Sequence, residues 1–239
     1  IVSNLPAKAG EPVLRLMVEH MISQLGSSGN GVAAAVVVEP LRKAVGRMIA
    51  ESGAHVLYKE STDSHTVYHF APAGEETGSP HTPFDHEASY SLPRPYFRTE
   101  VRTSLHGLRY AIDTVWGLKD FDTPGFEAQL FSQWAVKSPT SERLLVWNPG
   151  QGHIPAIALS AWGETLSSID LAGRDTLALA ASAHNLLFRT GGGVFAAADF
   201  REAAEMVMQG ENPRYDTVVI DLEHIPSVLR EEYLRGAAP

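Results

Sequence analysis

The chain of 239 residues contains no cysteine, which excludes disulfide bonds and thiolate metal sites. Basic residues are scarce, and the formal charge of −9 argues against a broad electrostatic surface for nucleic acid. Long apolar runs are also missing: the longest, such as residues 32–38, are far too short to cross a bilayer, so we expect a soluble protein. What is present, 44% hydrophobic residues, is enough for the core of one large or two small domains.

The first third of the chain has an α/β pattern. Apolar spacing predicts helices over residues 12–25 and 41–50, and the alanine and valine run at 32–38 predicts a strand buried on both faces. Residues 56–58 and 66–70 predict two further strands around a polar turn. This is too little for an independent doubly wound sheet, so we expect the first strands of this domain to lie upstream of the first residue.

Residues 71–95 differ in composition from the rest, because prolines and glycines alternate with acidic residues. This composition predicts a linker or a mobile insertion. His81 and His86 invite a metal interpretation, but their spacing matches no standard ligand motif. We therefore predict no metal site.

Ordered structure is predicted again from Tyr96. Residues 96–101 and 108–115 have strand character, and a turn at 122–125 precedes a helix over 126–136. One face of that helix carries large apolar side chains: Phe126, Leu130, Phe131 and Trp134. We interpret this stripe as core packing rather than as a platform for stacking bases.

The stretch from Leu144 to Asp170 predicts a strand, a glycine turn, a helix and a second strand. The first strand is 144–147, the turn is Asn148–Gly152, the helix is 154–162, and the second strand, 166–169, ends on Asp170. In a parallel sheet such a glycine turn lets a nucleotide approach the backbone, and an acidic strand end accepts hydrogen bonds from ribose. A plain strand-to-helix turn without a ligand, with Asp170 as a helix N-cap, fits the same residues.

The remainder of the chain continues the alternation of helices and strands. The predicted elements are a helix at 175–187, a strand at 194–199, a helix at 201–208, a strand at 215–221 and a helix at 225–234. Three successive strands then end on Asp170, Asp199 and Asp221. An open α/β sheet binds its ligands at this carboxyl edge.

The order of six segments resembles a known family. These are YFRTEVRTSLHGLRYAI, GLKDFDTPGFEAQLF, VWNPGQGHIPAIAL, SSIDLAGRDTLALAASAHNL, VFAAADF and YDTVVIDLEHIP. The chain is similar to the class I methyltransferases, and most similar to the two-domain ribosomal RNA guanine-N2 methyltransferases of the small-subunit methyltransferase C type. The resemblance implies a Rossmann-like α/β fold, with residues 1–73 as a partial, degenerate copy of that fold, a linker at 74–95, and a methyltransferase-like domain at 96–239 that lacks its last strands.

The resemblance also implies roles for particular residues. Gly150 and Gly152 match the glycines under the methionine part of S-adenosylmethionine. Asp170 matches the acid that holds the ribose hydroxyls, Leu171 the residue that packs against the adenine, and Asp199 lies near the position that caps the adenine amino group.

Several positions depart from the family pattern. Asn148 stands where an acid usually precedes the first glycine of the cofactor turn, and Ile154 replaces a third glycine, with its side chain expected to face the cofactor. The catalytic Asn-Pro-Pro-Phe is replaced by the four residues from Asp221 to His224. Asp221 could still accept a hydrogen bond from an exocyclic amine, and His224 could stack weakly on a base or take part in proton transfer.

Two functions follow from the resemblance. In the first, the protein acts in ribosome biogenesis by transferring a methyl group from S-adenosylmethionine to an rRNA base amine, which Asp221 orients. In the second, a catalytically inactive descendant binds rRNA or a ribosomal precursor particle, together with other assembly proteins. Either function implies an intracellular location, cytoplasmic or mitochondrial, and no membrane partner. A nicotinamide-binding oxidoreductase is disfavoured by the strand order and by the missing third glycine.

Overall fold

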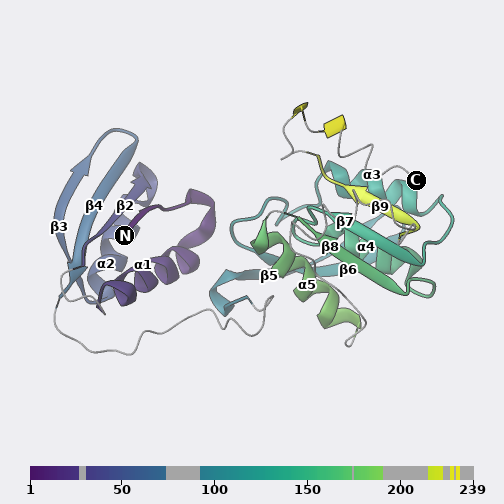
Figure 1. The fold of residues 1–239 in the computed structure, drawn as a ribbon, viewed down its shortest axis with the longest axis horizontal. Helices are drawn as coiled ribbons and strands as arrows, with labels where there is room; N and C mark the ends of the chain where they lie inside the picture. Colours follow the sequence, from purple (N-terminus) through teal and green to yellow (C-terminus); the bar gives the residue numbers. More distant parts are fainter. Residues whose placement is uncertain are drawn as a thin grey trace. The chain divides into compact units, whose positions relative to one another are not determined.

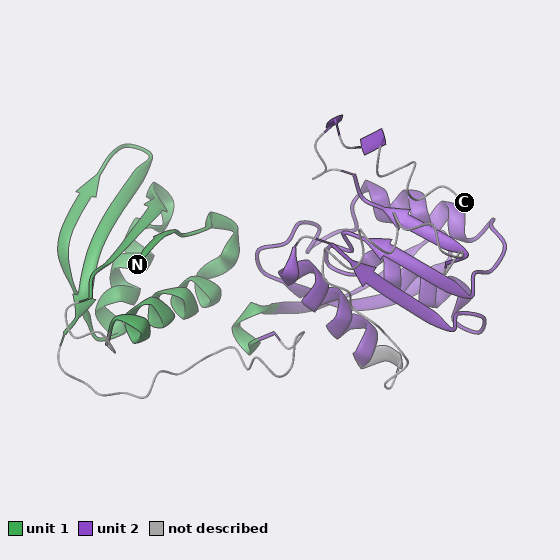
Figure 2. Ribbon diagram, in the orientation of Figure 1, with its two compact units in different colours: residues 1–87, 93–97 green, residues 88–92, 98–239 purple. Residues whose placement is uncertain are grey.

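The structure is a computed structural model that describes residues 1–26, 31–73, 92–173, 175–190, 215–222, 227–228 and 230–231 (Figure 1). The chain divides into two compact units (Figure 2). Unit 1 comprises residues 1–87 and 93–97, and unit 2 comprises residues 88–92 and 98–239. No helix within the described ranges has the length and apolar character needed to span a bilayer.

The described residues of unit 1 form two α-helices and four strands. In chain order, its elements are β1 (Val2–Asn4), η1 (Ala7–Ala9), α1 (Gly10–Gly26), β2 (Ala33–Val38), η2 (Glu39–Leu41), α2 (Arg42–Glu51), β3 (Ala54–Ser61), β4 (His65–Pro72) and η3 (Arg94–Tyr96). Both helices and the strands β2, β3 and β4 confirm the predictions made from apolar spacing, with boundaries that differ by a few residues at most of the ends.

The four strands of unit 1 form a mixed sheet in the order β1-β2-β4-β3. Strand β2 pairs parallel with β1 and antiparallel with β4, which pairs antiparallel with β3. The side chains of β2 alternate between buried and partly exposed, so the prediction of a strand buried on both faces is wrong. Alternation of this kind is typical of a sheet with helices on one face, here α1 and α2.

The core of unit 1 lies between this sheet and its two helices. Val18 of α1, Ile49 of α2 and Phe70 of β4 are all fully buried, so they mark the centre of this layer. That residues 1–73 derive from a degenerate methyltransferase domain stays a prediction.

Unit 2 contains three α-helices and five strands among its described residues. In chain order these are β5 (Phe97–Leu105), β6 (Leu108–Val115), α3 (Phe126–Ala135), β7 (Arg143–Trp147), α4 (His153–Trp162), β8 (Ser168–Ala172), α5 (Thr176–Thr190) and β9 (Thr217–Ile220). Strands β5 and β6 form a two-stranded sheet of their own. Strand β5 begins at the last residue that the division assigns to unit 1.

Strands β7, β8 and β9 form a parallel sheet in the order β8-β7-β9. The central strand, β7, is apolar on both faces: Leu144 and Val146 face one side, and Leu145 and Trp147 face the other. All four are buried. This is the expected character of a central strand in a parallel sheet, and it explains why a run of four apolar residues predicted β7 correctly.

The core of unit 2 is a layer of helices between two sheets. Helices α3, α4 and α5 share one apolar cluster with β7 and β8, and Tyr110 and Ile112 of β6 join the same cluster (Figure 1). The other face of the parallel sheet carries a smaller cluster of Leu145, Trp147 and Ala172. The fold is therefore a mixed α/β arrangement with the carboxyl ends of β7, β8 and β9 at one edge.

The structure tests the element predictions for unit 2 unevenly. Helices α3, α4 and α5 and strands β6, β7 and β9 confirm the predicted elements. The end predicted for the strand at Asp170 is wrong, because β8 runs on to Ala172. The strand predicted at 194–199 and the helix at 201–208 lie outside the described residues, as does most of the helix at 225–234.

Candidate functional site

The turn between β7 and α4 contains three residues with left-handed backbone. Asn148 has φ 58°, Gly150 has φ 59° and Gly152 has φ 93°. A side chain at Gly152 would lie 3.2 Å from the Cα atom of Ser182, so this glycine allows α5 to pack against the turn. A Cβ atom on Gly150 would meet no atom of the described residues within 4 Å. Of the two predicted cofactor glycines, only Gly150 leaves open space for a ligand.

Buried hydrogen bonds fix the turn from the sides of β6 and α5. The side-chain amide of Gln151 donates to the carbonyl of Val115 and accepts from its N–H, both at 2.9 Å. Asn185 Nδ2 donates to the carbonyl of Gln151 at 2.9 Å, and Ser182 Oγ donates to the carbonyl of Gly150 at 3.2 Å. Side chains of the turn itself and of α5 therefore hold the turn against β6 and α5.

Sequence reasoning missed these three polar residues. Gln151, Ser182 and Asn185 are all buried, and buried polar groups need partners. The available signal was the presence of Ser182 and Asn185 one helical turn apart on an alanine-rich helix. No local pattern indicated that Gln151 would pair with β6.

Asn148 follows β7 directly and connects it to the ends of β8 and β9, the two strands that flank it. Its backbone N–H donates to the carbonyl of Ala172 at 2.7 Å, and its Nδ2 donates to the carbonyl of Asp221 at 2.9 Å. Its Oδ1 would lie 2.9 Å from a Cβ atom on Gly173. The position predicted to contact the cofactor thus carries an amide that holds the carboxyl edge of the sheet together.

Asp170 lies in the middle of β8, opposite Leu145 of β7, and not at the end of the strand. Its Oδ2 accepts a hydrogen bond of 2.7 Å from the hydroxyl of Tyr215. The first residue after the strand is Gly173. The prediction that Asp170 ends the strand is therefore wrong, because β8 ends two residues later, at Ala172.

Leu171 is fully buried in the cluster beneath α4. This burial argues against the predicted contact with adenine, because no surface of the side chain is left for a ligand. Asp199 and His224, the other predicted cofactor and catalytic residues, lie outside the described residues.

Asp221 follows β9 at the carboxyl edge of the sheet. Its N–H donates to the carbonyl of Trp147 at 3.1 Å, which extends the pairing of β9 with β7. Its Oδ2 lies 3.5 Å from Lys119 Nζ, and the same ammonium group lies 3.1 Å from Glu127 Oε1. The carboxylate predicted to orient an acceptor amine is thus already paired with a cation.

His153, the first residue of α4, is buried against β6 and the loop that follows it. Its Nε2 lies 2.9 Å from the carbonyl oxygen of Asp120 and therefore carries the proton. Its Nδ1 accepts from the hydroxyl of Tyr110 at 3.0 Å. Burial lowers the pKa of His153 and raises the pKa of Tyr110, so it favours the neutral form of both groups, and their contact is structural.

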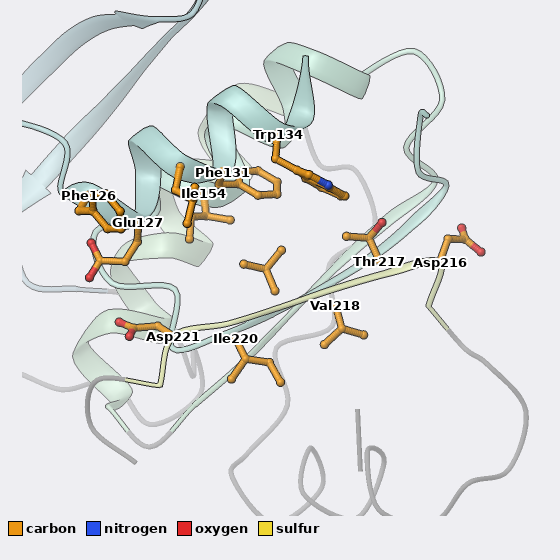
Figure 3. Close-up of a pocket in the computed structure, with 12 residues that line it drawn as sticks. Phe126, Glu127, Phe131, Trp134, Ile154, Asp216, Thr217, Val218, Ile220 and Asp221 are labelled. Carbon is orange, nitrogen blue, oxygen red and sulfur yellow. The ribbon is translucent and has the colours of Figure 1, made fainter. Parts of the chain in front are cut away.

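A groove of about 700 Å³ runs along β9 beneath α3 (Figure 3). Phe126, Leu130 and Trp134 of α3 line it together with the whole length of β9. Ile154 also lines this groove and belongs to the core beneath it, so its side chain faces α3. The expectation that Ile154 faces a cofactor over the glycine turn is therefore not supported.

Comparison with known proteins yields a likeness of fold. No family model matches the chain, and no curated protein matches its sequence. Among solved structures, the chain is similar to the T. thermophilus 16S rRNA N2 G1207 methyltransferase (RsmC), determined in complex with AdoMet and guanosine. The identity is 13% and the TM-score 0.53, over 92% of this chain and 54% of RsmC. The chain thus has a methyltransferase-like fold and spans about half the length of RsmC.

Proposed function

We propose that the protein is a catalytically inactive relative of the ribosomal RNA methyltransferases and acts in ribosome biogenesis as an assembly factor. It binds rRNA or a ribosomal precursor particle inside the cell, in the cytoplasm or in a mitochondrion. The likeness to RsmC, an enzyme whose substrate is 16S rRNA, supports the RNA partner. A shared fold does not imply a shared activity. The choice between an enzyme and an assembly factor therefore depends on the residues at the site.

The observation that carries the inactive assignment is the position of Asp170. S-adenosylmethionine would need an acid at the end of β8 to hold its ribose, and Gly173 stands there instead. The carboxylate of Asp170 is engaged by Tyr215 within the sheet. Gly150 leaves room for a ligand, but the polar groups that would orient S-adenosylmethionine do not fit it.

The acceptor side of the site supports the same conclusion. Methyl transfer depends on alignment of the nucleophile with the methyl carbon, and such alignment can supply about 7–11 kcal/mol of the barrier. Asp221 would have to leave Lys119 before it could orient an amine. Each such rearrangement reduces the preorganisation on which the rate depends.

An active rRNA methyltransferase is the second candidate. The open side of Gly150 and the position of Asp221 at the carboxyl edge of β9 favour it. This function would require Asp221 to exchange Lys119 for the exocyclic amine of a base.

Two measurements on the full chain distinguish the candidates. Calorimetry with S-adenosylmethionine should give no binding heat, and labelled S-adenosylmethionine should transfer no methyl group to RNA from immature small-subunit particles. The protein should nevertheless co-sediment with those particles. The Asp221→Asn variant should co-sediment equally, because the carboxylate has no catalytic task in an assembly factor.

The opposite results are equally clear. Methyl transfer by the wild type that disappears in Asp221→Asn would establish the enzyme and overturn the inactive assignment. Absence of both transfer and co-sedimentation would remove the ribosomal partner and with it both candidates.

A further inference from the structure

The negative charge of the chain is distributed unevenly along the sequence. Residues 1–73 contain six lysine or arginine residues and six aspartate or glutamate residues, so the whole excess of acid lies after residue 73. A net charge of −9 argues against a broad surface for nucleic acid, but it does not exclude a local one in a neutral part of the chain. Residues 31–73, which are described without a gap, hold four of these six cations.

Helix α2 presents cations to the surface and has no acid along most of its length. Lys43 and Arg47 lie one turn apart at exposed positions, and Arg42 begins the helix. The only acid of α2, Glu51, is its last residue and pairs with Arg15 of α1 at 2.7 Å. Among the described residues, neither Lys43 nor Arg47 takes part in an ion pair, so both charges face solvent.

Strand β3 adds a fourth cation beside α2, which packs against β3 and β4 (Figure 1). Lys59 is paired across the sheet with Tyr68 of β4, and its Nζ lies 5.4 Å from the centre of the tyrosine ring. The hydroxyl of Tyr68 donates to the carbonyl of Arg42 at 2.7 Å, so the ring reaches from Lys59 to the start of α2. Burial raises the pKa of Tyr68, and the nearby charge of Arg42 partly opposes this rise.

Gly46 makes the close approach of Tyr68 to the helix possible. It lies on α2 between Lys43 and Arg47, and a Cβ atom there would be 3.0 Å from the hydroxyl oxygen of Tyr68. That distance is tighter than an ordinary van der Waals contact. Glycine therefore lets the ring, and with it Lys59, lie against the cations of α2.

These cations form a basic patch on unit 1: Arg42, Lys43, Arg47 and Lys59. Only Arg42 has an acid partner among the described residues, Glu39 at 3.0 Å. The start of α2 lies near the hairpin between β3 and β4, because the N–H of Glu39 donates to the carbonyl of Ser64. The chain leaves β4 at the opposite end of the strand, where the N–H of Ala73 donates to the carbonyl of Gly53. Cations spread over a helix and a strand suit an extended polyanion better than a single small anion.

We propose that the basic patch holds the phosphate backbone of rRNA, an inference that rests on the proposed function. Lys43 and Arg47 contact neighbouring phosphates of one strand, and the other two cations extend the contact along the same surface. Cations that bind phosphates release condensed counterions, and this release favours binding whatever the sequence of the RNA. Tyr68 is only 3% exposed and offers no face to a base, so the patch positions RNA without reading its sequence.

Binding of a fluorescently labelled fragment of small-subunit rRNA, followed by anisotropy at several salt concentrations, tests the patch. Lys43→Gln combined with Arg47→Gln removes two charges and leaves the other two cations with their partners. We expect this double variant to bind RNA at least about tenfold more weakly at about 0.1 M salt, and the slope of log Kd against log salt to fall by about 1.4–1.8. A second rRNA fragment of different sequence should lose the same factor, because phosphate contacts carry no sequence information.

Arg109→Gln combined with Lys137→Gln is the matched control. It also removes one arginine and one lysine from exposed positions, but in unit 2, so its net charge equals that of the double variant. This control should bind RNA like the wild type. The exchange of Lys43→Arg with Arg47→Lys keeps both charges and should also bind like the wild type. Thermal melting followed by circular dichroism should show that all variants are folded.

Failure of the patch and failure of the proposed function give different results. RNA binding that is weakened no more in the double variant than in the control would overturn the patch and leave the rRNA partner in place. A wild type that neither binds RNA nor co-sediments with immature particles would overturn the rRNA partner as well. If the double variant loses co-sedimentation but keeps its RNA binding, the patch contacts an acidic protein of the particle and the proposal is wrong.

Discussion

The side chain of Asn148 donates a hydrogen bond of 2.9 Å to the backbone carbonyl of Asp221, and so joins the ends of β7 and β9. The two residues are 73 positions apart and were predicted to contact a cofactor and a substrate. Their direct contact gives both a structural task at the edge where an active methyltransferase would place its ligands.

The first prediction concerns the amide of Asn148. In Asn148→Asp the side chain keeps its shape but loses its donor, and a carboxylate then faces the carbonyl of Asp221. We expect the free energy of unfolding to fall by about 1–3 kcal/mol at pH 7. Urea denaturation followed by tryptophan fluorescence measures the change. Asn4→Asp, at an exposed position of β1, is the control and should change stability by less than about 0.5 kcal/mol.

Acid should partly rescue Asn148→Asp, because a protonated carboxyl can again donate to Asp221. The destabilisation relative to wild type should therefore shrink as the pH falls through the pKa of the new carboxyl group. A destabilisation that is the same at pH 7 and at acid pH would show that the hydrogen bond to Asp221 is not its cause.

The second prediction concerns Asp170 and Tyr215. Tyr215→Phe removes the hydroxyl that donates to the carboxylate of Asp170, and a hydrogen bond to a charged group contributes about 1.5–3 kcal/mol. We expect a loss of this size in the free energy of unfolding. In a double-mutant cycle with Asp170→Asn, the two losses should not add, because both substitutions weaken one bond. Additive losses would show that the two side chains act separately.

The position of Asp170 illustrates what the sequence could and could not predict. The apolar run before Asn148 and the glycines after it predicted β7, the turn and α4, because these depend on neighbours in the sequence. Asp170, which follows Ile169, was predicted to end the second strand. In the structure Ile169 and Leu171 face the helices, and Asp170 faces the other side of the sheet. There its carboxylate accepts a hydrogen bond from Tyr215, which is 45 positions away in the sequence.

The exposed stripe of α3 shows the same limit. Helical spacing predicted the helix and its apolar face correctly, but spacing does not say whether a face has a neighbour. Phe131 is buried because Trp162 of α4, 31 positions later, packs against it, whereas Phe126 has no such cover among the described residues and is 73% exposed. The prediction of core packing is therefore wrong for the exposed members of the stripe, Phe126, Leu130 and Trp134. The burial of a side chain depends on residues that are distant in the sequence, and a single sequence does not show which residues these are.

The third prediction concerns Gln151, whose side-chain amide forms hydrogen bonds with both the N–H and the carbonyl of Val115. Gln151→Glu keeps the shape but buries a carboxylate against that carbonyl, so we expect a loss of at least about 3 kcal/mol in the free energy of unfolding. Gln133→Glu, on the exposed face of α3, is the matched control and should be nearly neutral. Equal stability of the two variants in urea denaturation would contradict a role for Gln151 in fixing the turn.

The fourth prediction is a pH dependence that arises from His153. Burial lowers the pKa of this histidine below its ordinary value of 6.5, so the unfolded chain binds its proton more readily than the folded chain. The stabilisation is therefore complete above pH 6.5 and is lost as the pH falls from there toward the lowered pKa. Within that window the free energy of unfolding should fall by up to about 1.4 kcal/mol per pH unit for this one group.

Urea denaturation at pH 7.5 and pH 5.5 measures this dependence, and His153→Gln isolates it. The variant should be less stable than wild type at pH 7.5, because the contacts with Tyr110 and Asp120 are altered, yet it should lose less stability between the two pH values. His65→Gln, at an exposed position of β4, should keep the wild-type slope. If His153→Gln shows the same slope as wild type, protonation of another group causes the acid sensitivity, and the buried pair of His153 and Tyr110 is not its origin.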